Sequence, residues 1–281
     1  MNKYAVLGWP IKHSLSPAMH NPAFRAKNLD SQYEAIPCPP DQIAEVIAKL
    51  KSDQFKGWNC TVPLKEDIIP FLDFVDKEAL ACQSVNTVVV QENGELHGFS
   101  TDGYGLEKAI EEDLDMQLTG KRILMIGAGG AARAVAARFA KLNAQAITVI
   151  NRSADRAQTL LDTVRTMNPN CGVQYISPSE LSTKNNPALT HDIMIQCTSL
   201  GLKEDDALPF PTELLVPEIA LIDMIYAHTP LQKAAEKIGC NTAGGLGMLL
   251  HQGVRAWEMW TGIDAPTELM RDELIKVTQD K

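Results

Sequence analysis

The sequence predicts an α/β protein of two domains, each built on a mostly parallel sheet. Three observations support this fold class. Strand-like and helix-like segments alternate along the first part of the chain, which is typical of βαβ units. Near residue 120 a short hydrophobic strand runs into a glycine-rich turn and an alanine-rich helix, which starts a second series. The chain has 281 residues, more than the roughly 100–150 of a single domain of ordinary size.

Composition excludes several classes of protein. The chain has 26 Lys and Arg against 35 Asp and Glu, a formal net charge of −9, and no long basic run. A nucleic-acid surface needs a basic stripe that displaces counterions, so we expect no nucleic-acid partner. No stretch approaches the roughly 20 uncharged apolar residues of a bilayer span, so we expect no membrane partner. A hydrophobic content of 45% is ample for a folded core and leaves work on small molecules as the expected role.

The start of the chain and its cysteines indicate a cytoplasmic protein. Residues 1–9 run directly into a strand-like segment and lack the apolar region and cleavage site of a secretory signal. Six cysteines are scattered without a CxxC pair, so we expect reduced, structural thiols. They are Cys38, Cys60, Cys82, Cys171, Cys197 and Cys240. We expect no metal site, because neither HExxH nor another histidine-rich spacing is present.

The first domain is expected to carry a parallel sheet with a mixed edge. Its first half alternates strands at residues 4–8, 32–37 and 57–62 with helices at 16–28 and 41–51. Two further strands, at 85–91 and 96–99, are separated by a segment containing Asn93-Gly94, a dipeptide favoured in tight hairpin turns. Because hairpin strands are antiparallel, this pair mixes the sheet.

The second domain is expected to be doubly wound. Its first strand, at 122–126, leads into the glycine-rich turn and a helix that ends near Leu142. A strand at 146–150 and a helix at 154–167 follow, with further strands at 173–176, 192–196 and 220–223. After Gly244-Gly245 the pattern changes to an amphipathic helix at 246–261 and a last helix at 267–280.

The glycine-rich turn has the spacing of a dinucleotide site. Gly127 permits the tight turn, Gly129 lets the backbone approach a pyrophosphate, and the small Ala132 lets the helix pack close to the sheet. The helix N-terminus offers N–H groups and partial positive charge to phosphates. The turn alone is equally typical of a flexible loop, but the strand before it and the helix after it favour the dinucleotide site.

The end of the next strand indicates which dinucleotide is bound. NAD enzymes usually have an acidic residue there, whereas this chain has Asn151-Arg152-Ser153 with Arg156 one turn further on. Guanidinium groups can hold a 2′-phosphate through paired hydrogen bonds, so we expect NADP(H) in preference to NAD(H). The alternatives are that both arginines are solvated residues at a helix start, and that Asp155 supports NAD binding.

Five clusters of polar and small residues stand outside this turn. They are residues 8–21, 59–65, 84–87, 98–103 and 245–253. In the first cluster, Ser16-Pro17 is also typical of a serine N-cap followed by Pro at the first helical position. Taken together and in this order, the clusters and the glycine-rich turn resemble the shikimate dehydrogenase family over nearly the whole chain.

The resemblance implies an enzyme that uses NADPH to reduce 3-dehydroshikimate to shikimate, on the route to chorismate and the aromatic amino acids. In that family the cofactor domain is inserted into the catalytic domain. Carried onto this sequence, the substrate-binding domain covers residues 1–103 and 247–281, and the Rossmann-type NADP-binding domain covers 104–246. The partner is the small-molecule substrate, and both a monomer and a homodimer stay open.

The resemblance also implies a role for individual residues. The substrate carboxylate is expected to meet Ser14, Ser16 and Tyr226. The rest of the substrate is expected to meet Thr61, Lys65, Asn86, Thr101, Asp102 and Gln252. The cofactor is expected to meet Gly127, Ala128, Gly129, Gly130, Ala131, Ala132, Asn151, Arg152, Ser153, Arg156, Thr198, Met224 and Gly245. Taken alone, Lys65 is equally typical of a solvated lysine at a helix start, Asp102 of a helix cap and Asn86 of a turn.

Lys65 and Asp102 are the expected catalytic pair. Hydride transfer to a ketone builds negative charge on the carbonyl oxygen, so a positioned proton donor is needed beside it. A neighbouring carboxylate favours the charged ammonium form of Lys65. Because the two groups are coupled, neither is assigned as the formal acid or base.

Two alternative functions stay open. The first is a quinate or dual quinate/shikimate dehydrogenase, since members of the family share the Lys–Asp pair; Ser14, Ser16 and Thr101 decide the room for the extra hydroxyl of quinate and favour shikimate. The second is a non-catalytic NADP-binding regulatory protein, against which the intact Lys65 and Asp102 argue. The chain also departs from the family pattern. It has Gln83-Ser84 where the family usually has Gly-Ala, Ser100 where it has Asn, and Gln196-Cys197 where it has Asn-Ala. The loop after Tyr226 is shorter than the common form and lacks its usual Pro.

Overall fold

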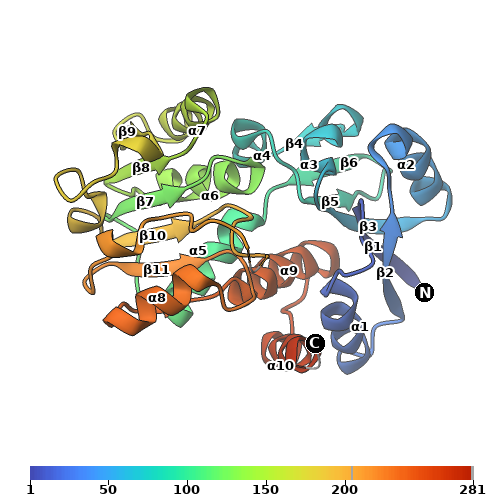
Figure 1. Ribbon diagram of the computed structural model, residues 1–281. Coiled ribbons are helices and arrows are strands. Elements are labelled where there is room, and N and C mark those ends of the chain that lie inside the picture. The colour runs from blue at the N-terminus through green and yellow to red at the C-terminus, as the bar shows by residue number, and fades with distance from the viewer. Residues whose placement is uncertain (204, 280–281) are drawn as a thin grey trace. The chain divides into compact units, whose positions relative to one another are not determined.

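The computed structural model describes residues 1–203 and 205–279. Within them the chain forms two six-stranded sheets in two compact units, Met1–Gly105 with Leu250–Lys281, and Leu106–Leu249 (Figure 1). The predicted α/β class with two mostly parallel sheets is confirmed. No helix of the described part of the chain is long and apolar enough to cross a bilayer. Residue 280, which we expected to belong to the last helix, lies outside the described residues.

The first sheet has the strand order β2-β1-β3-β5-β6-β4. Its strands are β1 (Asn2–Gly8), β2 (Ser31–Pro37), β3 (Phe55–Cys60), β4 (Phe74–Val75), β5 (Thr87–Val90) and β6 (Leu96–Phe99). β1 pairs in parallel with β2 and β3, whereas β5 is antiparallel to both β3 and β6, so the predicted hairpin and mixed sheet are confirmed. The antiparallel strand lies inside the sheet and not at its edge, because β4, a two-residue strand missed in the sequence, pairs with β6.

Helices of the first unit follow the prediction in part. They are α1 (Ser16–Ala26), α2 (Ile43–Ser52), α3 (Leu64–Asp67), α4 (Lys77–Cys82), α10 (Thr267–Gln279) and the single turns η1 (Pro40–Gln42) and η2 (Ile69–Phe71). Two further helices, α5 (Asp102–Asp113) and α9 (Leu246–Thr261), contain residues of both units. The predicted N-cap at Ser16 is wrong: Leu15 is the N-cap and Ser16 is already helical. Pro17 is tolerated there because N–H groups of the first turn have no intrahelical acceptor.

The second sheet has the order β12-β11-β10-β7-β8-β9, and its strand pairs are parallel. Its strands are β7 (Arg122–Ile126), β8 (Ala146–Ile150), β9 (Gly172–Ile176), β10 (Ile193–Gln196), β11 (Ala220–Asp223) and β12 (Thr242–Ala243). Its helices and single turns are α6 (Gly130–Lys141), α7 (Ala154–Met167), α8 (Pro230–Ile238), η3 (Pro178–Glu180), η4 (Pro187–Leu189) and η5 (Thr212–Leu214). The predicted doubly wound arrangement is confirmed, with α8 and β12 as additions.

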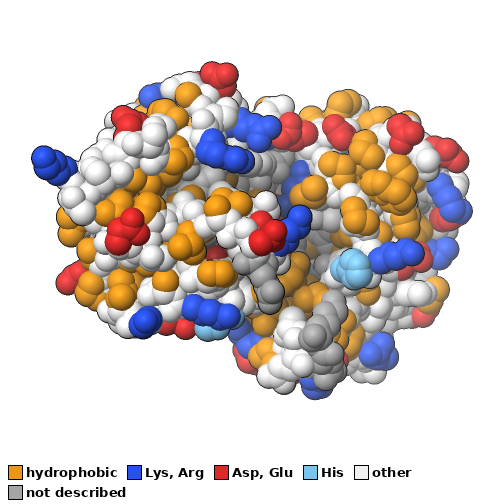
Figure 2. Space-filling view, viewed as in Figure 1, with side chains coloured by type: hydrophobic (Ala, Val, Ile, Leu, Met, Phe, Trp, Pro, Cys, Tyr) orange, Lys and Arg blue, Asp and Glu red, His pale blue; other side chains and the backbone are white. Residues whose placement is uncertain are grey.

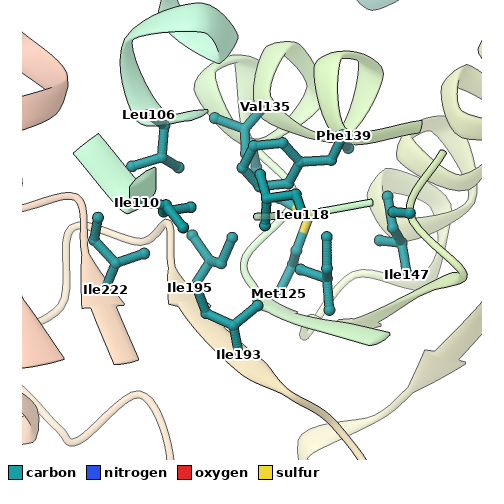
Figure 3. Close-up of a cluster of buried hydrophobic side chains, with 14 of the residues drawn as sticks. Leu106, Ile110, Leu118, Met125, Val135, Phe139, Ile147, Ile193, Ile195 and Ile222 are labelled. Carbon is teal, nitrogen blue, oxygen red and sulfur yellow. The ribbon is translucent and has the colours of Figure 1, made fainter. Parts of the chain in front are cut away.

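Alternation along β7 explains how this sheet is covered on both faces. Ile123 and Met125 join a core cluster with side chains of α5, α6 and α7, part of which Figure 3 shows. Leu124 and Ile126 belong to a second cluster that includes side chains of α8. Because successive residues of a strand point to opposite faces, one hydrophobic run supplies both layers.

Charge is mixed on the molecular surface. On the face shown in Figure 2, Lys and Arg side chains are interspersed with Asp and Glu, and no continuous basic surface is seen.

All six cysteines are free thiols, and all but Cys197 are buried. Burial raises the pKa of each of these thiols, so the reactive thiolate is disfavoured.

Candidate active site and cofactor site

Lys65 and Asp102 form an ion pair in the first unit. Lys65 lies in α3, shortly after β3 ends, and Asp102 is the first residue of α5. The Nζ of Lys65 contacts Oδ2 of Asp102, and the two side chains are only 18% and 6% exposed. The structure therefore brings together the two residues that the sequence singled out, and Lys65 is not a freely solvated lysine.

Asn86 fixes the orientation of the Asp102 carboxylate. Its Nδ2 donates to Oδ1 of Asp102 at 2.8 Å and to Oγ1 of Thr101 at 3.0 Å. Its Oδ1 accepts the backbone N–H of Thr101 at 2.7 Å. One oxygen of Asp102 is thus held by an amide while the other faces Lys65. Asn86 is not a simple turn former, because its side chain is buried and bonded on both sides.

A second layer of buried polar residues, which the sequence did not single out as a site, supports Asn86. The Nδ2 of Asn59 donates to the backbone oxygen of Asn86 at 3.0 Å and to Oγ1 of Thr87 at 3.1 Å. The hydroxyl of Tyr33 donates to Oδ1 of Asn59 at 2.6 Å. Asn59 lies in a cluster noted in the sequence, whereas Tyr33 reads as an ordinary core residue of a strand.

Topology places the predicted residues of the first unit along one edge of its sheet. Ser14 follows β1, Thr61 and Lys65 follow β3, and Asp102 follows β6. These three strands run in the same direction, since β6 is antiparallel to β5 and β5 is antiparallel to β3. Asn86 comes just before β5 and therefore reaches the same edge. Ligands of open α/β sheets bind outside the carboxyl ends of the strands, which is this edge.

Close packing ties the loops at this edge to one another. A Cβ added at Gly8 would lie 2.6 Å from Cγ2 of Thr61, and Trp9 N–H donates to the oxygen of Val62 at 3.2 Å. Within the loop after β1, Oγ of Ser14 accepts the N–H of Ser16 at 3.4 Å. The two predicted serines are therefore neighbours.

Gln252 enters the first unit on α9. Its neighbour Gly253 allows α9 to approach α1, because a Cβ at this glycine would lie 2.2 Å from Cε of Met19. Gln252 itself is largely buried.

The glycine-rich turn of the second unit has the geometry that the sequence predicts. Gly127 has φ +103°, and a Cβ there would lie 2.8 Å from Cγ2 of Thr198, so only glycine is free of strain and overlap. Gly129 is the N-cap of α6, and no described atom lies within 4 Å of where its Cβ would stand. Ala132 is fully buried in the core. Gly130 and Ala131 start α6, and Ala128 lies between the two glycines of the turn. The space beside Gly129, at the start of this helix, is open.

The segment after β8 presents two exposed arginines. Ser153 is the N-cap of α7 and accepts the N–H of Arg156 at 3.3 Å. Asn151 donates from Nδ2 to the oxygen of Ser153 at 2.8 Å, which stiffens the turn. Arg152 and Arg156 are both exposed, and no carboxylate ends the strand. These features fit NADP(H): glycine backbone and a helix start for the pyrophosphate, and guanidinium groups for a 2′-phosphate.

Gln196 organises the loop that carries Thr198. Its Oε1 accepts the N–H of Thr198 at 2.6 Å, and its Nε2 donates to the oxygens of Thr198 and Leu200 at 3.2 and 3.0 Å. Although Gln196 departs from the family pattern, its side chain still provides a carboxamide, which closes this turn. Nearby, a Cβ at Gly245 would lie 2.2 Å from the oxygen of Met224, so only glycine fits beside this backbone.

The short loop after Tyr226 is held by Asp223. One carboxylate oxygen accepts the N–H of Ile225 at 3.0 Å, and the other accepts the hydroxyl of Thr229 at 2.7 Å. Burial raises the pKa of Asp223. Tyr226 belongs to the second unit and is 57% exposed.

No group of His, Cys, Asp and Glu within residues 1–203 and 205–279 is arranged to hold a metal ion.

Comparison with known proteins shows three matching domain regions and similar full-length relatives. Residues 6–88 match the shikimate dehydrogenase substrate binding domain, residues 108–200 match shikimate / quinate 5-dehydrogenase, and residues 245–275 match the shikimate 5'-dehydrogenase C-terminal domain. A shikimate dehydrogenase (NADP(+)) of Desulfitobacterium hafniense is 38% identical over 273 residues, covering 96% of each chain. The chain belongs to the shikimate dehydrogenase family.

Solved structures of shikimate dehydrogenases have the same fold. The enzyme of Listeria monocytogenes, in complex with shikimate and NAD, has a TM-score of 0.91 and 31% identity, covering 98% of this chain and 96% of that one. The enzyme of Thermus thermophilus, in complex with NADP(H) and shikimate, has a TM-score of 0.86 and 33% identity, covering 98% and 99%.

Proposed function

We propose that the protein catalyses the reversible NADPH-dependent reduction of 3-dehydroshikimate to shikimate. The observation that carries this proposal is the partly buried Lys65–Asp102 pair, held by Asn86 at the carboxyl edge of the first sheet. The names of the family relatives support the same substrate and cofactor. In this reading the unit of residues 1–105 and 250–281 binds the substrate and the unit of residues 106–249 binds NADP(H).

Lys65 supplies the proton of the reaction. NADPH, when bound, supplies the hydride, which leaves negative charge on the former carbonyl oxygen. The ammonium of Lys65 stabilises that charge and donates a proton to the oxygen. Asp102 holds the ammonium in place, and Asn86 holds Asp102, so the donor has a defined position before the substrate arrives.

Polar groups at the same edge recognise the substrate. We assign the carboxylate to Ser14 and Ser16, because neutral hydroxyls suffice for a small anion when they converge. The role of Tyr226, a residue of the second unit, as a third donor stays a prediction from the family resemblance. The remaining contacts with the ring are assigned to Thr61, Asn86, Thr101 and Gln252. Both amide protons of Asn86 are already engaged within the protein, so its part is chiefly to orient Asp102.

Cofactor binding is assigned to the carboxyl edge of the second sheet. The backbone of Gly127–Ala132 and the start of α6 take the pyrophosphate. Arg152 and Arg156 take the 2′-phosphate, while Asn151 and Ser153 shape the turn that carries them. Thr198, Met224 and Gly245 are assigned to the nicotinamide side.

The main alternative is a quinate or dual quinate/shikimate dehydrogenase, because the model that matches residues 108–200 covers both activities. A cofactor alternative is NAD, which accompanies shikimate in the Listeria monocytogenes structure. A non-catalytic NADP-binding protein is disfavoured, since the ion pair and its supporting amide are intact.

A steady-state assay separates these alternatives. Shikimate and quinate are each offered with NADP⁺ and with NAD⁺, and the absorbance of the reduced nicotinamide is followed. We expect the highest kcat/KM with shikimate and NADP⁺. A higher value with quinate would identify a quinate dehydrogenase, and a higher value with NAD⁺ would reverse the cofactor assignment. No turnover in any combination would overturn the proposal that the protein is an enzyme.

We place this reaction in the cytoplasm, since six free thiols fit a reducing compartment. Either a monomer or a homodimer is compatible with the proposal, and light scattering of the purified protein decides between them.

A further inference from the structure

Tyr33 holds a fixed position in the first unit. It lies in β2, is 1% exposed, and its backbone is bound on both sides by the side chain of Asn21, at 2.8 Å in each case. Its ring stacks on His20 with centroids 4.4 Å apart. His20 is itself fully buried, and burial lowers its pKa to about 3, so the stack is between two neutral rings.

The hydroxyl of Tyr33 is the polar end of this fixed ring. Its single proton is donated to Oδ1 of Asn59 at 2.6 Å. The hydroxyl of this core residue therefore contacts the layer that supports Asn86.

The contact with Asn59 determines which way that carboxamide points. With Oδ1 turned to Tyr33, Nδ2 faces the backbone oxygen of Asn86 and the hydroxyl of Thr87. Oγ1 of Thr87 in turn lies 3.2 Å from Oδ1 of Asn86. A rotation of Asn59 by half a turn would bring oxygen against oxygen at Asn86.

We propose that Tyr33 is a positioning residue for the proposed reaction, whose hydroxyl orients Asn59 and through it the Asn86–Asp102–Lys65 chain. This inference rests on the proposed function. It assigns to a residue of the core strand β2 an effect on the proton-transfer step. Tyr33 touches no reacting atom in this role, since it acts through Asn59.

Removal of the hydroxyl leaves Oδ1 of Asn59 buried without this donor. A buried acceptor that loses its donor favours any rearrangement that satisfies it, including rotation of the carboxamide. Such a rotation would withdraw the support of Asn86 while the hydrophobic core is unchanged. The variant is therefore expected to lose activity as well as some stability.

The test is Tyr33→Phe, with Tyr4→Phe as the matched control. Tyr4 is 2% exposed and belongs to the same group of rings, contacting Phe24 and Trp260 at 5.1 Å, but its hydroxyl makes no hydrogen bond in the described part of the chain. For Tyr33→Phe we expect kcat and kcat/KM for shikimate to be lowered roughly tenfold or more. The KM for NADP⁺ should match that of Tyr4→Phe. The melting temperature should be lower than that of Tyr4→Phe, because Oδ1 of Asn59 is left buried without its donor.

The kinetic constants are compared at a temperature at which both variants are folded. Equal constants for the two variants at that temperature would overturn the proposal.

A readout that needs no turnover separates this inference from the proposed function. The side-chain amide resonances of Asn59 and Asn86 should shift and broaden in Tyr33→Phe and stay unchanged in Tyr4→Phe. Unchanged resonances in both variants would overturn the positioning role. If the resonances shift in Tyr33→Phe but the wild-type protein oxidises neither shikimate nor quinate, the proposed function would be overturned instead.

Discussion

At the residue scale, Lys65 pairs with a carboxylate whose other oxygen is already held by Asn86, so its ammonium has a defined position. General acid–base catalysis contributes about 10²–10⁴ in rate, so Lys65→Met should lower kcat by that order. The melting temperature should stay near wild type, as should the binding of NADPH, followed by nucleotide fluorescence, and of NADP⁺, followed by calorimetry. Near-normal kcat in this variant would mean that the proton comes from another group.

The pair also predicts a non-additive response. Asp102→Asn removes the charge that holds the ammonium of Lys65, so this change should lower activity as well. Groups that act as a unit give losses that do not multiply, so the double variant should lose less than the product of the single losses. A fully multiplicative loss in kcat would show that the two residues act independently.

Arg152 is the residue that tests the cofactor assignment. It is exposed at the end of β8, beside a turn fixed by Asn151 and Ser153. Loss of a hydrogen bond to a charged group costs about 1.5–3 kcal/mol, so Arg152→Ala should weaken NADP⁺ by that amount and NAD⁺ far less. Dissociation constants of both nucleotides measured by calorimetry provide the check. Equal weakening of both would contradict a 2′-phosphate contact.

At the element scale, the C-terminus of α4 explains one departure from the family pattern. Gln83 is the C-cap of this helix and has φ +50°, a left-handed conformation that glycine adopts without strain. Its Nε2 donates to the oxygen of Leu80 at 2.7 Å, which offsets part of the strain. The usual glycine of the family at this position therefore has a conformational reason.

This conformation predicts an order of stability for two variants. Gln83→Gly and Gln83→Ala both lose the bond to Leu80, but only alanine keeps the steric cost of the left-handed backbone, about 1 kcal/mol or more. The glycine variant should thus be more stable than the alanine variant by that amount in urea unfolding. Equal stability of the two would show that the backbone relaxes at residue 83.

Elements with a complete local signal were predicted to the residue, whereas the two-residue strands were missed. β7, β8, β11, α7 and α9 begin and end where the sequence predicts. The missed helix α8 does carry recognisable signals, namely Thr229 as N-cap, Pro230 in the first turn and Gly239 at its end. β4 and β12 have two residues each, so their strand character comes from pairing with neighbours and is absent from the sequence pattern.

At the scale of the whole molecule, a buried histidine makes stability depend on pH. Burial lowers the pKa of His20 to about 3 from 6.5, so between these values the unfolded chain binds a proton that the folded one does not. The free energy of unfolding should therefore be fully maintained above pH 6.5 and fall as the pH decreases toward 3. From this group alone the loss between pH 7.5 and pH 5 is about 2 kcal/mol.

His20→Phe tests this pH dependence, because it keeps a ring in the stack and removes the titrating group. Unfolding in urea, followed by tryptophan fluorescence, should show a smaller loss of stability between pH 7.5 and pH 5 in this variant than in wild type. Tyr4→Phe changes the same group of rings and should retain the wild-type dependence. An identical loss in wild type and His20→Phe would place the acid sensitivity elsewhere.

The sequence by itself determined the α/β class, the glycine-rich turn and the absence of an acid after β8, and it singled out Lys65 and Asp102, which the structure pairs. These features can be predicted from the sequence because hydrophobic period, turn residues and motif spacing are local properties of the chain. Only the tertiary structure decided that Ser16 is helical rather than an N-cap, that β5 lies inside its sheet, and that Tyr33 and Asn59 stand behind Asn86. The physical reason is that a buried hydrogen-bond network joins residues far apart in sequence, and its partners are chosen by strand order and register, which no local pattern encodes.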